Sequence, residues 1–453
     1  MAERTIAAIS TPSGEGGIGV IRISGSEAIR IADRVFKSVS GKELTSLSGY
    51  SALFGHVIHN DEIVDEAVAT VFLAPKSYTG EDVCELSCHG GSYVTKAVLR
   101  AVLSAGATLA QPGEFTKRAF LNGKLDLTEA ESVMGLIAAK SREELRLQLA
   151  AKMGRTSKEI ADIEATLLEL SADFAAYSDF PDEDLEELSP ENFSRLLKKA
   201  RQGLEGLIST YDSGRVLREG IKTAIVGKPN VGKSTLMNLL SKEERSIVTD
   251  VAGTTRDVIE NTVNIGSITL ILADTAGIRA TEDLVEEVGV RLAKDRIGSS
   301  QLTLAVFDCS SPLDADDRDI LTLLDPATTL VVLNKSDKGQ MVSEADFTDF
   351  TTVLISAKQG NGADELEKAI ANISGISRLD PAAAVLLSER QRDLATQALS
   401  AAVEAENLLN AGYTPDAVGV CVDEALTHLY TLDGKRVTNE VADEVFRRFC
   451  VGK

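Results

Sequence analysis

Residues 227–234 have the residue types and spacing of a loop that binds nucleotide phosphates. They read Gly-Lys-Pro-Asn-Val-Gly-Lys-Ser, between an apolar run at 221–226 that predicts a buried strand and a predicted helix starting near Thr235. In such a loop, backbone N–H groups and the helix N-terminus surround the β-phosphate. Lys233 is expected to reach the β and γ oxygens, and the Ser234 hydroxyl to bind Mg²⁺. A glycine turn with a stray lysine is the alternative, but the flanking elements are those that the motif requires.

Two segments that could contact the γ-phosphate and its metal ion follow in the chain. A polar loop at 249–257 contains paired threonines, and we assign Thr255 to completing the Mg²⁺ shell. Asp274 ends a predicted strand, where it can bind Mg²⁺ through water, and the N–H of Gly277 can contact the γ-phosphate. The predicted strands at 260–265 and 268–273 are joined by Gly-Ser, which indicates a hairpin.

Two later segments could select the base. Asp337, in Asn-Lys-Ser-Asp at 334–337, can accept hydrogen bonds from N1–H and N2–H₂ of guanine, a donor pair that adenine lacks. Residues 356–358, Ser-Ala-Lys, are expected to close over the base. Because each segment follows a predicted strand, the order predicts one doubly wound α/β domain that binds GTP. The predicted GTP-binding residues are Asn230, Val231, Gly232, Lys233, Ser234, Thr235, Thr249, Asp250, Val251, Ala252, Gly253, Thr254, Thr255, Asp274, Thr275, Ala276, Gly277, Asn334, Lys335, Asp337, Ser356, Ala357 and Lys358.

The residue after Asp-Thr-Ala-Gly is Ile278, where many switch GTPases have a glutamine that orients the attacking water. A carboxylate from the acidic stretch 282–287 could take that role, and a charged helix start is the alternative. The charge between the β- and γ-phosphates could be cancelled by Arg256 or Arg279. A monovalent cation held by Asn230 and carbonyls of the 249–255 loop could do the same.

The composition of the 453 residues limits the other possibilities. The net charge of −22 and the absence of Trp argue against nonspecific binding of nucleic acid, so such a substrate would need a local basic patch or a basic partner. No apolar run is long enough to span a membrane, and the start of the chain has no signal-peptide pattern. Five cysteines over this length do not form a disulfide framework. We expect a cytosolic protein with reduced thiols and no membrane contact.

The pattern of the chain predicts a multidomain fold in which an α/β P-loop G domain at 220–376 is inserted into an all-α helical domain formed by 120–219 and 377–453. Residues 1–119 alternate short strands, predicted at 18–24, 67–73 and 83–87, with glycine turns, a polar turn at 78–82 and a helix at 92–104, which predicts an α+β domain. Within it, Cys84, Cys88 and His89 could suggest a metal site, but half-buried strand cysteines are the better interpretation.

Four motifs extend over nearly the whole chain: Gly-Ile-Gly-Val-Ile-Arg-Ile-Ser-Gly at 17–25, Tyr-Thr-Gly-Glu-Asp-Val-Cys-Glu-Leu at 78–86, Pro-Gly-Glu-Phe-Thr-Lys-Arg-Ala-Phe-Leu-Asn-Gly-Lys-Leu-Asp-Leu at 112–127, and Phe-Cys-Val-Gly-Lys at the end. With these motifs the chain closely resembles the MnmE (TrmE) family of tRNA-modification GTPases. The resemblance implies a homodimer that forms a heterotetramer or larger complex with an FAD-dependent MnmG (GidA)-type subunit. It also implies addition of an aminomethyl or carboxymethylaminomethyl group at C5 of the wobble uridine of certain tRNAs.

The resemblance also implies cofactors and residue roles. The N-terminal domain would dimerise and bind 5-formyltetrahydrofolate or a methylene-tetrahydrofolate through Arg22, Glu85, Lys124 and Lys453. The GTPase would be activated by K⁺, bound by Asn230, Thr249, Val251 and Thr254, with Mg²⁺ on Ser234 and Thr255. Glu286 matches the glutamate that orients water, and the G domains would dimerise across the nucleotide.

Cys450 leaves two interpretations open: a thiol nucleophile toward uridine, or a small buried residue that packs the C-terminal tail.

Two other functions compete with the modification GTPase. One is a regulatory RNA-binding GTPase of ribosome assembly, which would be expected to have a basic RNA-binding surface, and the net charge of −22 argues against that. The other is a folate-binding protein whose GTPase controls assembly.

Overall fold

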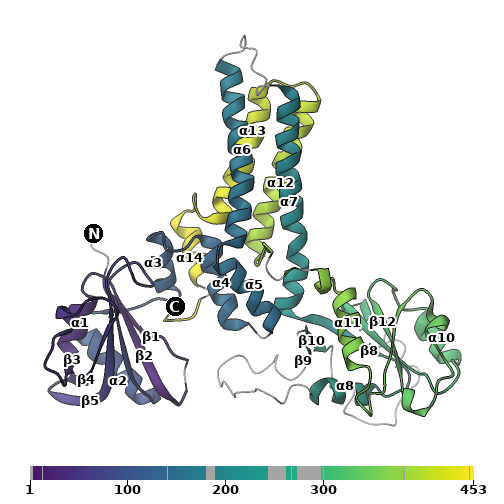
Figure 1. The fold of residues 1–453 in the computed structure, drawn as a ribbon, viewed down its shortest axis with the longest axis horizontal. Coiled ribbons are helices and arrows are strands. Elements are labelled where there is room, and N and C mark those ends of the chain that lie inside the picture. Colours follow the sequence, from purple (N-terminus) through teal and green to yellow (C-terminus); the bar gives the residue numbers. More distant parts are fainter. Residues whose placement is uncertain are drawn as a thin grey trace.

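The computed structural model describes residues 4–12, 14–139, 141–179, 189–242, 262–266, 268–272, 297–298, 300–378, 380, 383–447 and 449–452. They form a domain of sheet and helices at the N-terminus, a helical domain, and an α/β domain. Figure 1 shows the two sheet domains on opposite sides of the base of a long helical bundle. No helix of the described residues is long and apolar enough to cross a membrane.

The N-terminal domain is built on a seven-stranded sheet in the order β3-β4-β5-β6-β2-β1-β7. All neighbouring strands are antiparallel except β1 and β7. The elements are β1 (Ile6–Ile9), β2 (Gly16–Ser24), α1 (Ala28–Val35), β3 (Phe36–Ser38), η1 (Leu44–Ser46), β4 (Ser51–His59), β5 (Glu62–Phe72), β6 (Val83–Gly90), α2 (Ser92–Ser104), β7 (Thr108–Leu109) and α3 (Glu114–Leu121).

The two faces of this sheet differ because side chains alternate along each strand. Ile21, Ile23 and Cys84 are fully buried against α1 and α2 in one apolar core. Their neighbours Arg22 and Glu85 lie on the opposite face, directly across from each other in the register of β2 and β6. The candidate folate residues of the strands therefore share the face that α1 and α2 leave uncovered.

The helical domain joins two parts of the chain that are far apart in sequence. Its helices are α4 (Leu127–Ala138), α5 (Arg142–Lys152), α6 (Arg155–Asp179), α7 (Pro190–Glu219), α12 (Glu389–Asn410), α13 (Pro415–Asp433) and α14 (Asn439–Arg447). Helices α6, α7, α12 and α13 form the long bundle of Figure 1, with a common apolar core. Fully buried Ala395, Ala398 and Ala402 let α12 approach its neighbours closely. Arg390 joins α12 to α4 through Glu131 (Nε–Oε1 2.8 Å).

The α/β domain contains a six-stranded sheet in the order β13-β12-β11-β8-β10-β9, parallel except for β9. Its elements are β8 (Ile221–Val226), α8 (Lys233–Lys242), β9 (Thr262–Ile265), β10 (Ile268–Leu272), β11 (Leu302–Asp308), α10 (Ala315–Leu321), β12 (Thr329–Asn334), η6 (Ser336–Lys338), η7 (Glu344–Phe347), β13 (Thr351–Leu354), α11 (Ala363–Ile373) and η8 (Ile376–Arg378). Buried strand residues such as Leu304 and Val332 are apolar because helices cover both faces.

The predicted fold class, an α+β domain, a helical domain and an inserted α/β P-loop domain, is confirmed. The predicted hairpin is also present, since β9 and β10 pair antiparallel. The division drawn at 119/120 falls inside α3, which ends at Leu121. Strands β1 and β4 and helix α1 were not predicted. β1 is a run of four apolar residues, Ile-Ala-Ala-Ile, so it shows no alternation of polar and apolar side chains.

Candidate functional site

The phosphate loop connects β8 to α8, as predicted. Gly227 and Gly232 have φ values of 144° and 101°, which a residue with a Cβ rarely adopts. A Cβ on Gly232 would also lie 2.2 Å from Nδ2 of Asn334. Only glycine at this position therefore lets the loop approach Asn334, the last residue of β12. Lys233 Nζ donates hydrogen bonds to the carbonyl oxygens of Gly227 and Lys228, both at 2.7 Å. The loop is therefore closed around the ammonium group expected to contact the β- and γ-phosphates.

Other predicted residues of the loop are accessible to a ligand. Asn230, Ser234 and Thr235 are exposed, whereas Val231 is buried and anchors the loop. Asn230 has φ of 65°, a left-handed conformation that asparagine tolerates better than most residues. Ser234 is in the first turn of α8, where a hydroxyl beside the helix N-terminus can join a magnesium–phosphate complex.

Asn334, the last residue of β12, joins the phosphate loop to the base-closing segment. Its Nδ2 donates to the Val231 carbonyl at 2.9 Å, and its Oδ1 accepts from the Ala357 N–H at 3.0 Å. The side chain is 2% exposed, and both of these hydrogen bonds are to the backbone. Three of the segments predicted from sequence are thus brought together at the carboxyl edge of the parallel sheet, the usual ligand-binding edge of such folds.

Asp337 and Lys335 are held by different partners. Ser356 Oγ donates to Asp337 Oδ1 at 2.7 Å and, as the main cause, lowers the pKa of this exposed carboxyl. Asp337 is therefore charged at neutral pH and presents an acceptor to solvent. Lys335, with φ of 69°, forms an ion pair with Asp308 at 2.6 Å. Burial would raise the pKa of Asp308, but hydrogen bonds from Lys335 and Ser310 outweigh it and hold the pKa below its usual range.

Asp308 was not predicted as a site residue, although it follows the buried run of β11 as Asn334 follows that of β12. The same strand-end rule could have found it. Several predicted residues lie outside the described part of the chain. These are Thr249, Asp250, Val251, Ala252, Gly253, Thr254, Thr255, Asp274, Thr275, Ala276, Gly277, Glu286 and Lys453. Of the predicted metal ligands, only Ser234 and Asn230 are described.

Arg22 is at the centre of the candidate folate site in the N-terminal domain. Its Nε donates to Glu85 Oε1 at 2.8 Å, and its guanidinium lies over the rings of Tyr78 and Phe115, 5.1 and 5.7 Å from their centroids. Arg22 Nη1 is buried without a hydrogen-bond partner among the described residues. The Tyr78 hydroxyl shares a 2.9 Å hydrogen bond with Thr116, and burial is the main reason its pKa is raised.

Lys124 does not reach Arg22 or Glu85 through any hydrogen bond described here, but its Nζ donates to the Pro75 carbonyl at 3.0 Å. This contact keeps the 122–124 turn against the segment that precedes Tyr78. The neighbouring Asn122 supports the same turn by donating to the Thr79 carbonyl at 2.8 Å. The predicted polar turn at 78–82 is therefore more buried than expected, since Thr79 is fully buried.

Cys450 is exposed, so the interpretation as a small buried residue is wrong. The tail packs instead through its backbone, because the Gly113 N–H donates to the Cys450 carbonyl at 3.3 Å and Ser10 Oγ donates to the Gly452 carbonyl at 3.1 Å. A Cβ on Gly452 would lie 2.3 Å from the Ile9 carbonyl oxygen. The C-terminus is therefore docked along β1 with its thiol accessible, which is compatible with a reactive cysteine.

Cys84, Cys88 and His89 do not form a metal site. Both cysteines face the apolar core and are more buried than predicted, at 0% and 4% exposure, and burial raises the pKa of Cys88 to about 11. His89 is on the opposite face, where its Nδ1 is 2.7 Å from Asp65 Oδ1. Across the described ranges, no group of three or more His, Cys, Asp or Glu side chains could hold a metal ion.

The α/β fold, together with the base-reading residues Asn334, Asp337 and Ser356 at the carboxyl edge of its sheet, defines a P-loop guanine-nucleotide-binding protein. The chain has two additional domains. A family model described as "GTP-binding protein TrmE N-terminus" matches residues 5–124, and one described as "MnmE helical domain" matches 127–450. The chain belongs to the MnmE (TrmE) family of tRNA modification GTPases.

Curated relatives match over almost their whole length. The chain is 43% identical over 457 residues to the "tRNA modification GTPase MnmE" of Geobacter sulfurreducens, covering 100% of this chain and 99% of the relative. It is 39% identical over 454 residues to the protein of the same name from Clostridioides difficile, covering 99% of each. Among solved structures, the G domain of the T. maritima FeoB iron transporter covers 34% of this chain and 98% of its own, at 20% identity and a TM-score of 0.25.

Proposed function

We propose that this GTPase is activated by K⁺ and works in the cytoplasm with an FAD-dependent MnmG-type subunit. Together they would add a carboxymethylaminomethyl or aminomethyl group at C5 of the wobble uridine of certain tRNAs, using a tetrahydrofolate one-carbon unit. The observation that carries the proposal is that one chain combines a preformed guanine-reading edge, at Asp337 and Ser356, with a second cluster in which Arg22 Nη1 is buried without a hydrogen-bond partner among the described residues. This combination fits a protein that couples GTP hydrolysis to a second ligand.

In the nucleotide site, the residues of the chain bind, orient and screen the triphosphate. Asp337 would read N1–H and N2–H₂ of guanine, and Lys233 would leave its two carbonyl partners partly or wholly to contact the β- and γ-oxygens. Glu286 would orient the attacking water, since Ile278 cannot. When bound, Mg²⁺ at Ser234 and Thr255 and K⁺ at Asn230, Thr249, Val251 and Thr254 would cancel negative charge on the phosphates.

In the N-terminal domain, Arg22, Glu85, Lys124 and Lys453 would bind the folate. A planar guanidinium held by two rings can donate to a pterin carbonyl or to a glutamate carboxylate, and Glu85 can accept from a pterin amine. The exposed Cys450 on the docked tail would act as a nucleophile toward the uridine ring. The divisions of the chain at 219/220 and 376/377 stay part of this proposal, whereas the first division moves beyond Leu121, where α3 ends.

Exposed apolar side chains on the sheet face that carries Arg22 support a homodimer through the N-terminal domain. Phe54 and Val68 face each other on β4 and β5 and are 51% and 39% exposed, and Ile18 on β2 is 67% exposed. Apolar side chains gathered on one face of a sheet are typical of a surface that another chain covers. Covering this face would also enclose Arg22 and Glu85 on its side of the sheet.

Two measurements test the proposal. GTP hydrolysis by the full chain should be much faster in K⁺ than in Na⁺, and equal rates would exclude the ion-binding role of Asn230. In cells that lack the gene, nucleoside analysis should find tRNA without the wobble modification, restored by the wild-type copy but not by Lys233→Ala. An unchanged modification level would favour a ribosome-assembly GTPase or a folate-binding protein whose GTPase controls assembly.

A further inference from the structure

Lys228 occupies a position of the phosphate-loop motif at which any residue is allowed, yet its side chain has specific partners. Its Nζ lies 2.5 Å from Asp314 Oδ2 and 2.7 Å from Asp317 Oδ2. Burial would lower the pKa of Lys228, but the hydrogen bonds with the two carboxylates outweigh it and raise the pKa. The ammonium group is therefore charged and bound to α10 rather than directed to a nucleotide.

The two aspartates are fixed by their own helix. Asp314 is the N-cap of α10, its side chain accepts from the Asp317 N–H, and the Asp317 side chain accepts from the Asp314 N–H. Such a reciprocal capping box leaves both carboxylates little freedom. Asp317 is 3% exposed, and its Oδ1 has no hydrogen-bond partner in the described residues. A buried carboxylate needs a nearby cation, and Lys228 supplies it.

Lys228 is also held at its backbone, because its carbonyl accepts a hydrogen bond from Lys233 Nζ. The side chain of Lys228 thus connects α10 to the carbonyl that positions the phosphate-binding ammonium group. The preceding Gly227 lies against β11, where an added Cβ would be 2.4 Å from the Val306 carbonyl oxygen. The same 308–317 segment provides Asp308, which binds Lys335 of the base-reading motif. The 308–317 segment therefore supports both the phosphate loop, through Lys228, and the base-reading motif, through Lys335.

We propose that Lys228 is a positioning residue for guanine nucleotides: its ion pairs with Asp314 and Asp317 hold the phosphate loop in the conformation that receives the β-phosphate. A loop with two glycines and a left-handed Asn230 would otherwise lose conformational entropy on binding. Because GDP, GTP and the transition state all use this loop, releasing the ion pairs weakens them equally. The change therefore raises Kd and KM and leaves kcat nearly constant.

An ion pair on an open, solvated surface would contribute little to stability. The ion pair between Lys228 and Asp317 differs from such a pair because it is largely shielded from solvent. The Lys228 side chain is 19% exposed and that of Asp317 is 4% exposed, so solvent and salt screen their interaction less than on an open surface. Asp314 is more exposed, at 54%, and Lys228 is the main cause of its lowered pKa.

The test uses the full chain and fluorescent GDP, with Lys228→Met removing the charge while keeping much of the side-chain volume. We expect the Kd for GDP to rise about tenfold, KM for GTP to rise by a similar factor, and kcat to stay within about twofold. Lys228→Arg should recover most of the affinity because it restores the cation. Lys368→Met, the same change at an exposed position of α11 in the same domain, should bind GDP within about twofold of the wild type.

A double-mutant cycle separates positioning from loss of folding. Asp314→Asn keeps a capping side chain and removes one carboxylate, so Lys228→Met and Asp314→Asn should weaken GDP binding by less together than the product of their separate effects. The proposal is overturned if Lys228→Met binds GDP as tightly as Lys368→Met, if kcat falls while KM is unchanged, or if Lys228→Arg restores nothing. The inference depends on guanine-nucleotide binding alone. Equal GTPase rates in K⁺ and Na⁺ would exclude the potassium proposal without altering these affinities.

Discussion

Asn334 in the α/β domain and Arg22 in the N-terminal domain are both largely buried polar side chains at the centre of a candidate site, but their hydrogen bonding differs. Asn334 bonds through Nδ2 and Oδ1 to the backbone of two neighbouring segments. Arg22 bonds to Glu85 through Nε and has a buried Nη1 without a partner in the described structure. Buried donors are nearly always satisfied in folded proteins, so the missing acceptor is expected from a ligand or a second chain.

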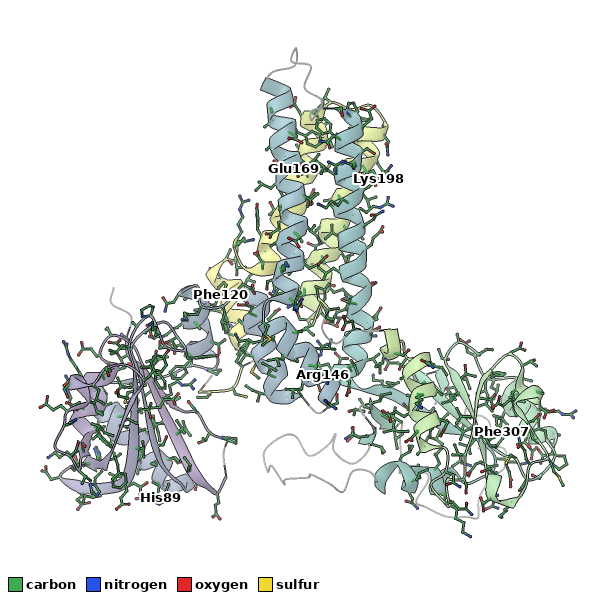
Figure 2. The ribbon with its side chains drawn as sticks, viewed as in Figure 1. His89, Phe120, Arg146, Glu169, Lys198 and Phe307 are labelled. Atoms are coloured by element: carbon green, nitrogen blue, oxygen red, sulfur yellow. The ribbon has the colours of Figure 1, made fainter. Side chains whose placement is uncertain are left out.

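The difference suggests two ways of preparing a binding site. In the α/β domain, hydrogen bonds within the protein fix the geometry, so the ligand meets a site that already has its shape. The sheet beneath this site has a packed core, and Figure 2 labels one of its residues, Phe307 of β11. In the N-terminal domain, rings and one carboxylate orient Arg22, but part of its hydrogen-bonding capacity is left for the ligand. Substitutions in the first site should therefore affect nucleotide affinity, GTP hydrolysis and base selection, and substitutions in the second site should affect folate affinity.

The largest expected effect follows from Lys233→Ala. Removing the ammonium group takes away the charge that would stabilise the β- and γ-oxygens, so kcat for GTP hydrolysis should fall by about 10²–10³-fold. Single-turnover hydrolysis with excess protein measures this directly. Binding of 5-formyltetrahydrofolate should be unchanged in the same variant, and a parallel loss of folate binding would contradict the independence of the two sites.

A smaller effect is expected for Asp337→Asn, which converts one carboxylate oxygen into an NH₂ donor. The remaining oxygen can still accept from Ser356 Oγ, so the local fold should persist. GDP affinity should fall by about 10–100-fold because a charged acceptor for guanine is lost. Xanthosine diphosphate should bind better than GDP, since it offers an oxygen where guanine offers an NH₂ group. Competition of the two nucleotides against fluorescent GDP measures the change, and retained preference for GDP would exclude the assignment of Asp337.

The two sites also differ in how far they can be predicted from sequence. In the parallel sheet, Asn334, Asp337 and Ser356 follow apolar strand runs, and the carboxyl ends of parallel strands meet at one edge. Val231 of the phosphate loop, 103 positions before Asn334, follows β8 in the same way, so the three segments could be placed together from local patterns alone. The role of Lys228 could not be predicted in this way, because its partners Asp314 and Asp317 lie at the start of a short helix and follow no strand directly.

In the N-terminal domain, local patterns predicted strands β2 and β6 but not their register. A shift of one residue would have moved Arg22 into the apolar core and Ile21 or Ile23 onto the open face. The resemblance to a family placed Arg22 and Glu85 in one folate site, but their pairing with each other was not predicted. Phe115 was missed altogether, because it comes from α3, a helix whose packing onto the sheet depends on tertiary structure.

Arg22→Met tests whether the unsatisfied donor binds the folate. The variant keeps an unbranched side chain between the rings but loses every N–H, so affinity for 5-formyltetrahydrofolate should fall at least about tenfold. Arg22→Lys should restore only part of it, because an ammonium group lacks the planar set of donors. Calorimetric titration of the full chain measures both. GTP hydrolysis without folate should match the wild type, and a folate affinity that is unchanged in Arg22→Met would place the folate elsewhere.

The smallest effect is expected for Tyr78→Phe. Comparison with Tyr78→Leu separates the role of the Tyr78 ring in orienting Arg22 from the hydrogen bond of its hydroxyl. Tyr78→Phe removes the bond to Thr116 and keeps the ring 5.1 Å from the Arg22 guanidinium, so folate affinity should change by less than about twofold. Unfolding should become easier by about 1 kcal/mol, the usual contribution of one such hydrogen bond. Tyr78→Leu also removes the cation–π contact and should weaken folate binding several-fold, about 0.5–1 kcal/mol. If both variants bind folate equally well, the Tyr78 ring does not orient Arg22, and that role would belong to Phe115 and the Glu85 ion pair.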